Sequence, residues 1–174
     1  MTGNERVLVH ATSVVLDRAA APFGGAKDSA VLLLGDSGVG KSDVALRLIG
    51  MGAKLLSDDQ TVLFVKDGRL MADTPPSLHG QMEIRGVGIV KMVSAGPAVI
   101  SLAVYFGVDR AVPRLPEPAT YRPPAPLQPL LAPPLLTLRA FEPSTPVKIA
   151  AAAAAAGRGS FVAGAAGPSS ASSL

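Results

Sequence analysis

The feature that most constrains this chain is the segment of residues 35–42, Gly-Asp-Ser-Gly-Val-Gly-Lys-Ser, which fits the pattern G-x-x-x-x-G-K-[ST] at every fixed position. An apolar run at residues 30–34 precedes this segment, and apolar residues at helical spacing follow it within residues 41–51. A strand, a glycine-rich loop and a helix in this order predict a P-loop, whose backbone N–H groups and helix N-terminus bind phosphate.

The positions of this loop have expected roles in binding a nucleoside triphosphate with Mg²⁺. Lys41 is expected to reach the β- and γ-phosphates, and the hydroxyl of Ser42 is expected to ligate Mg²⁺. The predicted nucleotide-binding set is the whole loop: Gly35, Asp36, Ser37, Gly38, Val39, Gly40, Lys41 and Ser42. A P-loop alone does not separate kinases from GTPases or ATPases, because phosphoryl transfer also needs a carboxylate for the metal and a group that orients or deprotonates the nucleophile.

Two adjacent carboxylates are candidates for those further roles. Asp58 and Asp59 follow a short apolar segment after the predicted helix, at the sheet edge where α/β proteins bind their ligands. Neighbouring carboxylates near Mg²⁺ can differ in protonation, so one of them can act as a base near neutral pH. The alternative is a solvated turn, because aspartate is common in turns.

Four other polar residues are weighed in the same way. His10 lies on an N-terminal strand and serves catalysis only if that strand folds back beside the P-loop; otherwise it is a core or surface histidine. Glu83 and Arg85 are two residues apart, so on a strand they face one side, and the alternative is an ordinary surface ion pair. Arg114 lies in a proline-rich stretch, and the sequence leaves open whether it faces solvent or supplies charge to a transition state.

Composition predicts a single folded domain with a tail. The chain has 174 residues, of which 48% are hydrophobic and 17% charged, a balance typical of a globular protein. Most of its prolines fall within residues 112–146, which predicts an irregular stretch with an edge strand at residues 135–141. Seven alanines from residue 150 favour helix, and the segment from residue 157 is of low complexity. We therefore expect a catalytic domain at residues 1–148 and a disordered tail rich in Ala, Gly and Ser at residues 149–174.

Several classes of function are disfavoured. The chain has no cysteine, which excludes disulfides and thiol chemistry. Its basic residues are not clustered, so no nucleic-acid partner is expected. The longest apolar stretch, residues 98–108, is about half of what a membrane-spanning helix needs, and the N-terminus lacks the order of a signal peptide. A cytoplasmic protein without a membrane partner is the expectation.

The motifs taken together resemble a known family. His10, the GDSGVGKS loop, the pair Asp58-Asp59 and the EIRGVGI segment at residues 83–89 occur in the order found in the catalytic domain of HPr kinase/phosphorylase, over about residues 7–115. This resemblance implies an ATP- and Mg²⁺-dependent kinase that phosphorylates a serine of the phosphocarrier protein HPr. It also implies an α/β fold, a P-loop kinase core with a mixed β-sheet similar to phosphoenolpyruvate carboxykinase, and assembly as a hexamer.

The resemblance also assigns roles to individual residues. Lys41 and Ser42 would take the phosphates and Mg²⁺, with Glu83 completing the metal site. Arg114 matches the position of a family arginine near the site.

A second group would handle the proton. Asp59, supported by Asp58 and His10, would accept the proton of the substrate serine and return it in the reverse reaction.

Two departures from the family pattern bear on function. The chain begins almost at the histidine, as in short alphaproteobacterial forms, and the PVxPGRN-type segment is reduced to Pro146-Val147-Lys148-Ile149 followed by alanines. The second departure leaves the phosphorylase activity open. The alternatives weighed are a nucleotide-sensing binding module that has lost transfer, and an ATPase that uses water as acceptor.

Overall fold

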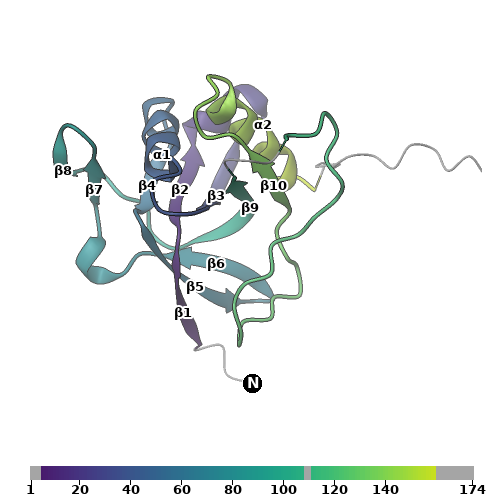
Figure 1. The fold of residues 1–174 in the computed structure, drawn as a ribbon. Coiled ribbons are helices and arrows are strands. Elements are labelled where there is room, and N and C mark those ends of the chain that lie inside the picture. Colours follow the sequence, from purple (N-terminus) through teal and green to yellow (C-terminus); the bar gives the residue numbers. More distant parts are fainter. Residues whose placement is uncertain (1–4, 108–110, 160–174) are drawn as a thin grey trace, which may run out of the picture.

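The computed structural model describes residues 5–107 and 111–159 (Figure 1). Its strands are β1 Arg6–His10, β2 Thr12–Asp17, β3 Ala26–Leu34, β4 Lys54–Ser57, β5 Gln60–Lys66, β6 Arg69–Asp73, β7 Gln81–Ile84, β8 Gly88–Lys91, β9 Ala98–Phe106 and β10 Leu135–Leu138. Two α-helices, α1 Lys41–Gly50 and α2 Thr145–Gly157, and two short 3-10 helices, η1 Arg18–Phe23 and η2 Pro76–Leu78, complete the described part.

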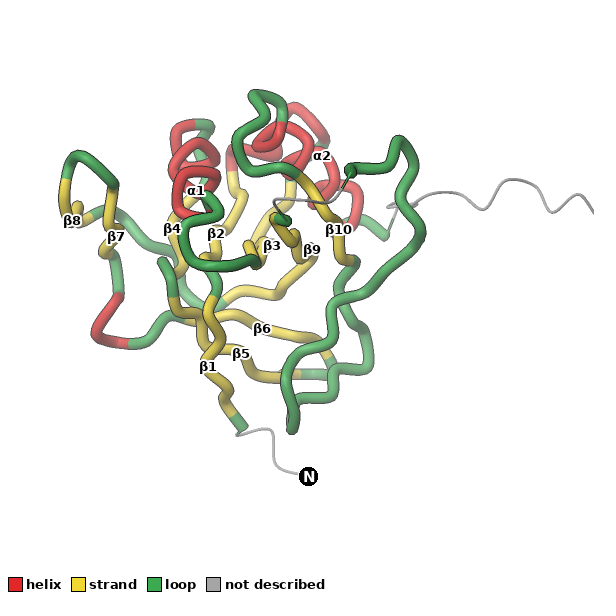
Figure 2. The backbone as a smooth tube through the Cα atoms, in the orientation of Figure 1, coloured by secondary structure: helices red, strands yellow, loops and turns green. Residues whose placement is uncertain are grey.

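Eight of these strands form one mixed sheet. Their order is β1-β5-β6-β9-β3-β2-β4, with β10 added beside β9. The pairs β3–β9 and β9–β10 are parallel, and the other pairs are antiparallel. Figure 2 shows the sheet curling, so that β1, β5 and β6 run at an angle to β2, β3 and β9. The α/β fold with a mixed sheet that we expected is confirmed.

The curl gives the sheet two apolar faces. Along β3, Val31 and Leu33 face the cluster that contains α1 and α2, whereas Ala30 and Leu32 face a second cluster enclosed by β5 and β6. This alternation follows from the period of two along a strand. Because β3 is covered on both sides, its sequence is a continuous apolar run rather than an alternating one, as in other buried strands.

A separate two-stranded hairpin stands beside the main sheet. Strands β7 and β8 pair only with each other, and Figure 1 shows them projecting near the start of α1. Gly86 lies in the turn with a positive φ of 83°, which glycine adopts without strain. Gly88, at the start of β8, also has a positive φ, so both glycines of the segment serve the hairpin.

The domain boundary predicted near residue 148 needs correction, because helix α2 crosses it. Ile149, Ala150, Ala153 and Ala154 are fully buried, and the helix packs against β3, β9, α1 and η1. The spacing of these four residues forms one stripe of a helix. The alanine run therefore belongs to the folded domain as far as Gly157, whereas residues 160–174, the rest of the predicted tail, lie outside the described residues.

Candidate active site

The predicted P-loop lies between β3 and α1. Strand β3 ends at Leu34, and Gly40 is the N-cap of α1 with a φ of 110°. A Cβ at Gly40 would lie 2.9 Å from both the Cβ of Ala140 and a ring carbon of Phe141, so this position requires glycine for its space as well as for its backbone. Apolar residues of α1 bury one face of the helix in the core, which fixes its N-terminus at the loop.

Lys41 occupies the centre of the loop. Its side-chain ammonium donates to the carbonyl oxygens of Gly35 and Asp36 at 2.7 and 2.9 Å, and its Nζ lies 3.2 Å from Nε2 of His10. Burial lowers the pKa of Lys41, while the carboxylates of Asp59, Asp36 and Asp58 oppose that shift. The residue is 5% exposed, so its charge depends on the groups of the site rather than on solvent.

His10 is brought to the site because β1 pairs with β5, next to the two aspartates. Its Nδ1 lies 3.3 Å from Oδ1 of Asp59, on the opposite side of the ring from Lys41. An ammonium group can only donate, so Nε2 accepts from Lys41, and Nδ1 then carries the proton that faces Asp59. The imidazole thus links the lysine of the P-loop to the second aspartate, which satisfies the condition that the sequence set for a role of His10.

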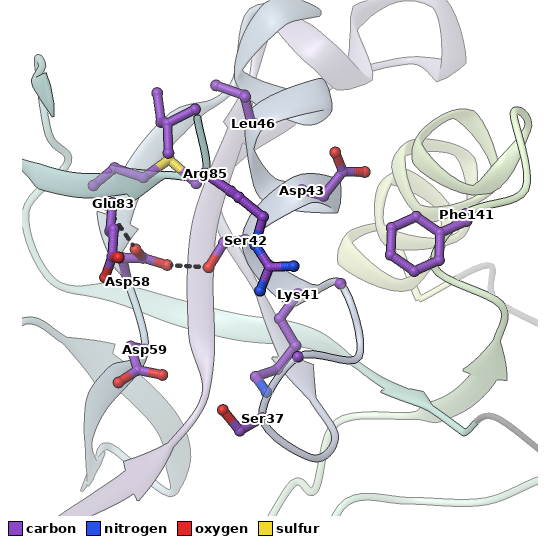
Figure 3. A pocket seen from close by; sticks show the side chains of 14 residues that line it. Ser37, Lys41, Ser42, Asp43, Leu46, Asp58, Asp59, Glu83, Arg85 and Phe141 are labelled. Carbon is purple, nitrogen blue, oxygen red and sulfur yellow. Dashed lines mark hydrogen bonds between the residues drawn. The ribbon is translucent and has the colours of Figure 1, made fainter. Parts of the chain in front are cut away.

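Asp58 points into the protein and accepts three hydrogen bonds. They come from the Ser42 hydroxyl at 2.7 Å, the Thr12 hydroxyl at 3.2 Å and the backbone N–H of Glu83 at 3.2 Å. The carboxylate is 7% exposed and joins the P-loop, β2 and the hairpin (Figure 3). It is not the solvated turn that the sequence offered as an alternative.

Asp59 points the other way, into the cleft. Its φ of 66° lies in the left-handed region, which aspartate tolerates better than most residues. Its backbone N–H donates to the Thr12 hydroxyl at 3.1 Å, and its side chain is 66% exposed. Thr12 therefore fixes both aspartates. Sequence reasoning missed it, because a threonine in a strand carries no distinguishing signal.

The P-loop, the aspartates and the hairpin enclose a cleft of about 510 Å³. Glu83 and Arg85 both line it, as their spacing on a strand predicts, and Figure 3 shows Arg85 extending toward the P-loop. Among the ion pairs of the described residues there is none between Glu83 and Arg85, so the surface-pair alternative is not supported. Arg85 is a cleft residue to which the sequence had assigned no catalytic role.

Arg114 is the site residue that the structure does not bring to the cleft. It is exposed in the segment that follows β9, and it is absent from the lining of the cleft. Its assigned role therefore stays a prediction that rests on sequence position alone.

The oxygen atoms of Ser42, Asp58 and Glu83 suit Mg²⁺ bound together with a nucleotide better than they suit a metal ion held by protein side chains alone. Within residues 5–107 and 111–159 no three His, Asp or Glu side chains converge as a metal cage. The Ser42 hydroxyl donates to the carboxylate of Asp58, and the backbone N–H of Glu83, on the hairpin, donates to the same carboxylate. One or two carboxylates with phosphate oxygens is the donor set that Mg²⁺ takes in nucleotide sites.

The described part of the chain also has no helix long and apolar enough to cross a bilayer.

Comparison with known proteins agrees with this geometry. Residues 26–98 match the model of the family described as HPr Serine kinase C-terminal domain. The HPr kinase/phosphorylase of Limosilactobacillus reuteri is 46% identical over 61 residues, which cover 34% of this chain and 19% of that protein. Over this segment the chain is similar to HPr kinase/phosphorylase. The enzyme of the same name from Streptococcus salivarius is 43% identical over 84 residues, 44% of this chain and 27% of that protein.

The likeness extends to three dimensions. The structure of the Hpr(Ser) kinase/phosphatase from Coxiella burnetii aligns with a TM-score of 0.63 and 21% identity, covering 83% of this chain and 91% of the other. That likeness confirms the fold. The chain spans about a fifth to a quarter of the length of the curated relatives it matches. The matched family segment includes the P-loop, the aspartates and the hairpin but neither His10 nor Arg114, so the place of His10 rests on the contacts described above.

Proposed function

We propose that this chain is an ATP- and Mg²⁺-dependent protein kinase that phosphorylates a serine of HPr or a closely similar phosphocarrier protein. The observation that carries the proposal is the pair of aspartates, of which Asp58 contacts the Ser42 hydroxyl of the P-loop and Asp59 faces the open cleft. The family match supports the substrate class. The proposed core is that of P-loop kinases, similar to phosphoenolpyruvate carboxykinase.

The first part of the mechanism is binding of the triphosphate. The loop amides and Lys41 would hold the β- and γ-phosphates, and Ser42, with the carboxylates of Asp58 and Glu83, would hold the metal. Mg²⁺ supplies positive charge that neutralises the phosphate oxygens as the γ-phosphoryl group transfers. Because the Lys41 ammonium is buried, its attraction for that developing charge is stronger than it would be in water.

The second part is proton transfer. Asp59 accepts the proton of the serine hydroxyl. As it does so, the serine oxygen bonds to the γ-phosphorus, and the bond from that phosphorus to the β,γ-bridging oxygen breaks. His10 holds the carboxylate in place, since its Nδ1–H faces Oδ1 at 3.3 Å. In dephosphorylation, an oxygen of inorganic phosphate would bond to the phosphorus of the phosphoserine and form pyrophosphate as the bond from phosphorus to the serine oxygen breaks, and Asp59 would return the proton to that oxygen.

Transfer of labelled phosphate from ATP to purified HPr tests this proposal. Label is expected on HPr with the wild-type protein and not with Asp59→Asn, which should still bind ATP. Asp67→Asn is a matched control, because Asp67 is an exposed aspartate with a similar φ of 51° in a turn outside the cleft. Normal transfer by Asp59→Asn would remove Asp59 from its role, and release of free phosphate without labelled HPr would refute the kinase proposal.

The setting of the reaction is also part of the proposal. By likeness to the family we propose a cytoplasmic hexamer with neither a nucleic-acid nor a membrane partner. Sedimentation equilibrium of the purified chain tests the assembly, and a monomer at micromolar concentration would contradict it.

A further inference from the structure

An exposed aromatic side chain lines the cleft on the side away from the carboxylates. Phe141 lies between β10 and α2 and is 70% exposed, although it is the largest apolar residue of the lining. Figure 3 shows it across the P-loop from Asp58 and Glu83, with Lys41 and Ser42 between. A phenyl ring that folding leaves in water beside a binding cleft is available to contact a ligand.

The backbone on both sides of Phe141 is held to helix α1. Arg47 donates from Nη1 to the carbonyl oxygen of Glu142 at 3.1 Å and from Nη2 to that of Ala140. Its Nε donates to Asp43 at 2.9 Å, which orients the guanidinium from the first turn of the same helix. The ring is therefore carried by a segment that is fixed relative to the P-loop.

The ring also touches the loop itself. The nearest ring carbon of Phe141 would lie only 2.9 Å from a Cβ at Gly40, so glycine allows the phenyl group to approach the backbone directly before the helix start. Asp43, one residue past the phosphate-binding lysine and serine, lines the cleft between the loop and the ring. The aromatic surface thus begins where the phosphate-binding surface ends.

We propose that Phe141 stacks on the base of the bound nucleotide, an inference that rests on the nucleotide binding proposed above. In the mechanism proposed above, the γ-phosphate end of the triphosphate lies near Asp59, which lines the cleft. The nucleoside must then extend from the other end of the triphosphate, past the start of α1, which is the side where Phe141 lies. The loop itself contacts only phosphates, so a group outside it, such as the phenyl ring, is needed to distinguish a nucleotide from a bare polyphosphate.

The chemistry of stacking sets the expected selectivity. Every base has a π-face, and contact with an aromatic ring is tolerant of the base because it uses no hydrogen-bond pattern. Purine triphosphates, with the larger ring area, should bind more tightly than pyrimidine triphosphates, and tripolyphosphate should bind most weakly. Adenine and guanine should differ little.

Calorimetry with ATP and with tripolyphosphate, each in the presence of Mg²⁺, distinguishes stacking on the base from binding of the phosphates. Phe141→Ala should weaken ATP about 5- to 20-fold, the range expected for stacking on a partly exposed ring, and should leave tripolyphosphate within about twofold. Leu130→Ala is the control, because Leu130 is an even more exposed apolar residue outside the cleft lining, and it should change neither affinity.

A conservative variant gives a direct signal. The chain has no tryptophan, so Phe141→Trp introduces a single indole that should restore ATP affinity and be quenched by ATP but not by tripolyphosphate. Unchanged ATP affinity in Phe141→Ala, or an equal loss for both ligands, would overturn the stacking role while nucleotide binding stands. If the wild-type protein bound neither ligand, the nucleotide site would be refuted and this inference with it.

Discussion

Removing the buried carboxylate of Asp58 should destabilise the protein far more than removing an exposed one. In Asp58→Ala the Glu83 N–H and the Thr12 and Ser42 hydroxyls all lose their acceptor. Thr12 is fully buried, so its hydroxyl cannot turn to solvent. A buried group left without a partner costs about 1–3 kcal/mol. Counting Thr12 in full and the other two in part, we expect a loss of about 3 kcal/mol.

That loss translates into a measurable shift in melting temperature. For a domain of this size 1 kcal/mol corresponds to about 2–4 °C, so Asp58→Ala should melt about 6–12 °C lower. Asp58→Asn should lose about half as much, because its carbonyl can accept from the Glu83 N–H while its amide donates to the two hydroxyl oxygens. Asp43→Ala is the control: its carboxylate is 50% exposed and pairs with Arg47, so the expected loss is at most about 1 kcal/mol.

Calorimetry, with hydrogen exchange of the Glu83 amide as a local readout, checks this reasoning. The amide should exchange faster in Asp58→Ala than in the wild-type protein and be unaffected in Asp43→Ala. Equal melting temperatures for the two alanine variants, with unchanged exchange at Glu83, would show that Asp58 does not join the hairpin to the P-loop.

Three other perturbations follow from the same structure. Ile149→Ala should cost about 2–5 kcal/mol because the side chain is fully buried, whereas the exposed Val147→Ala should cost less than about 1 kcal/mol, as chemical denaturation would measure. Because burial lowers the pKa of Lys41 below 10.5, the unfolded chain keeps this proton to higher pH than the folded one. Stability should therefore rise with pH between the two pKa values, and urea titrations of Lys41→Met should lack that rise. Gly40→Ala should weaken ATP binding, because the left-handed backbone and the 2.9 Å approach leave no room for a methyl group; unchanged affinity in calorimetry would argue against the described loop geometry.

The parts of the site that the sequence predicted are those specified by local patterns. The P-loop depends on a strand, a turn and a helix that are adjacent in the chain, and its glycines are required by their own backbone conformations. The two aspartates were recognised as a pair, but their opposite orientations depend on the positive φ of Asp59 and on Thr12. Those are consequences of strand pairing, which no local pattern contains.

The parts that the sequence did not predict depend on contacts between distant segments. Arg47 lies on an amphipathic helix like any surface arginine, and only the return of residues 140–142 gives it two carbonyl partners. Phe141 was assigned to an edge strand, whereas β10 ends at Leu138. The hairpin of β7 and β8 was not recognised because its glycines interrupt both the strand and the helix periodicity.

The alanine helix α2 shows how repetition in a sequence can encode shape. Methyl groups at residues 150, 153 and 154 let its backbone lie close to the strands beneath it, and longer side chains at these three places would push the two layers apart. The alanines between them are only partly buried, so they should accept more substitutions than the buried ones. A screen that discards simple sequence would therefore remove part of the interior of this protein while seeming to trim its end.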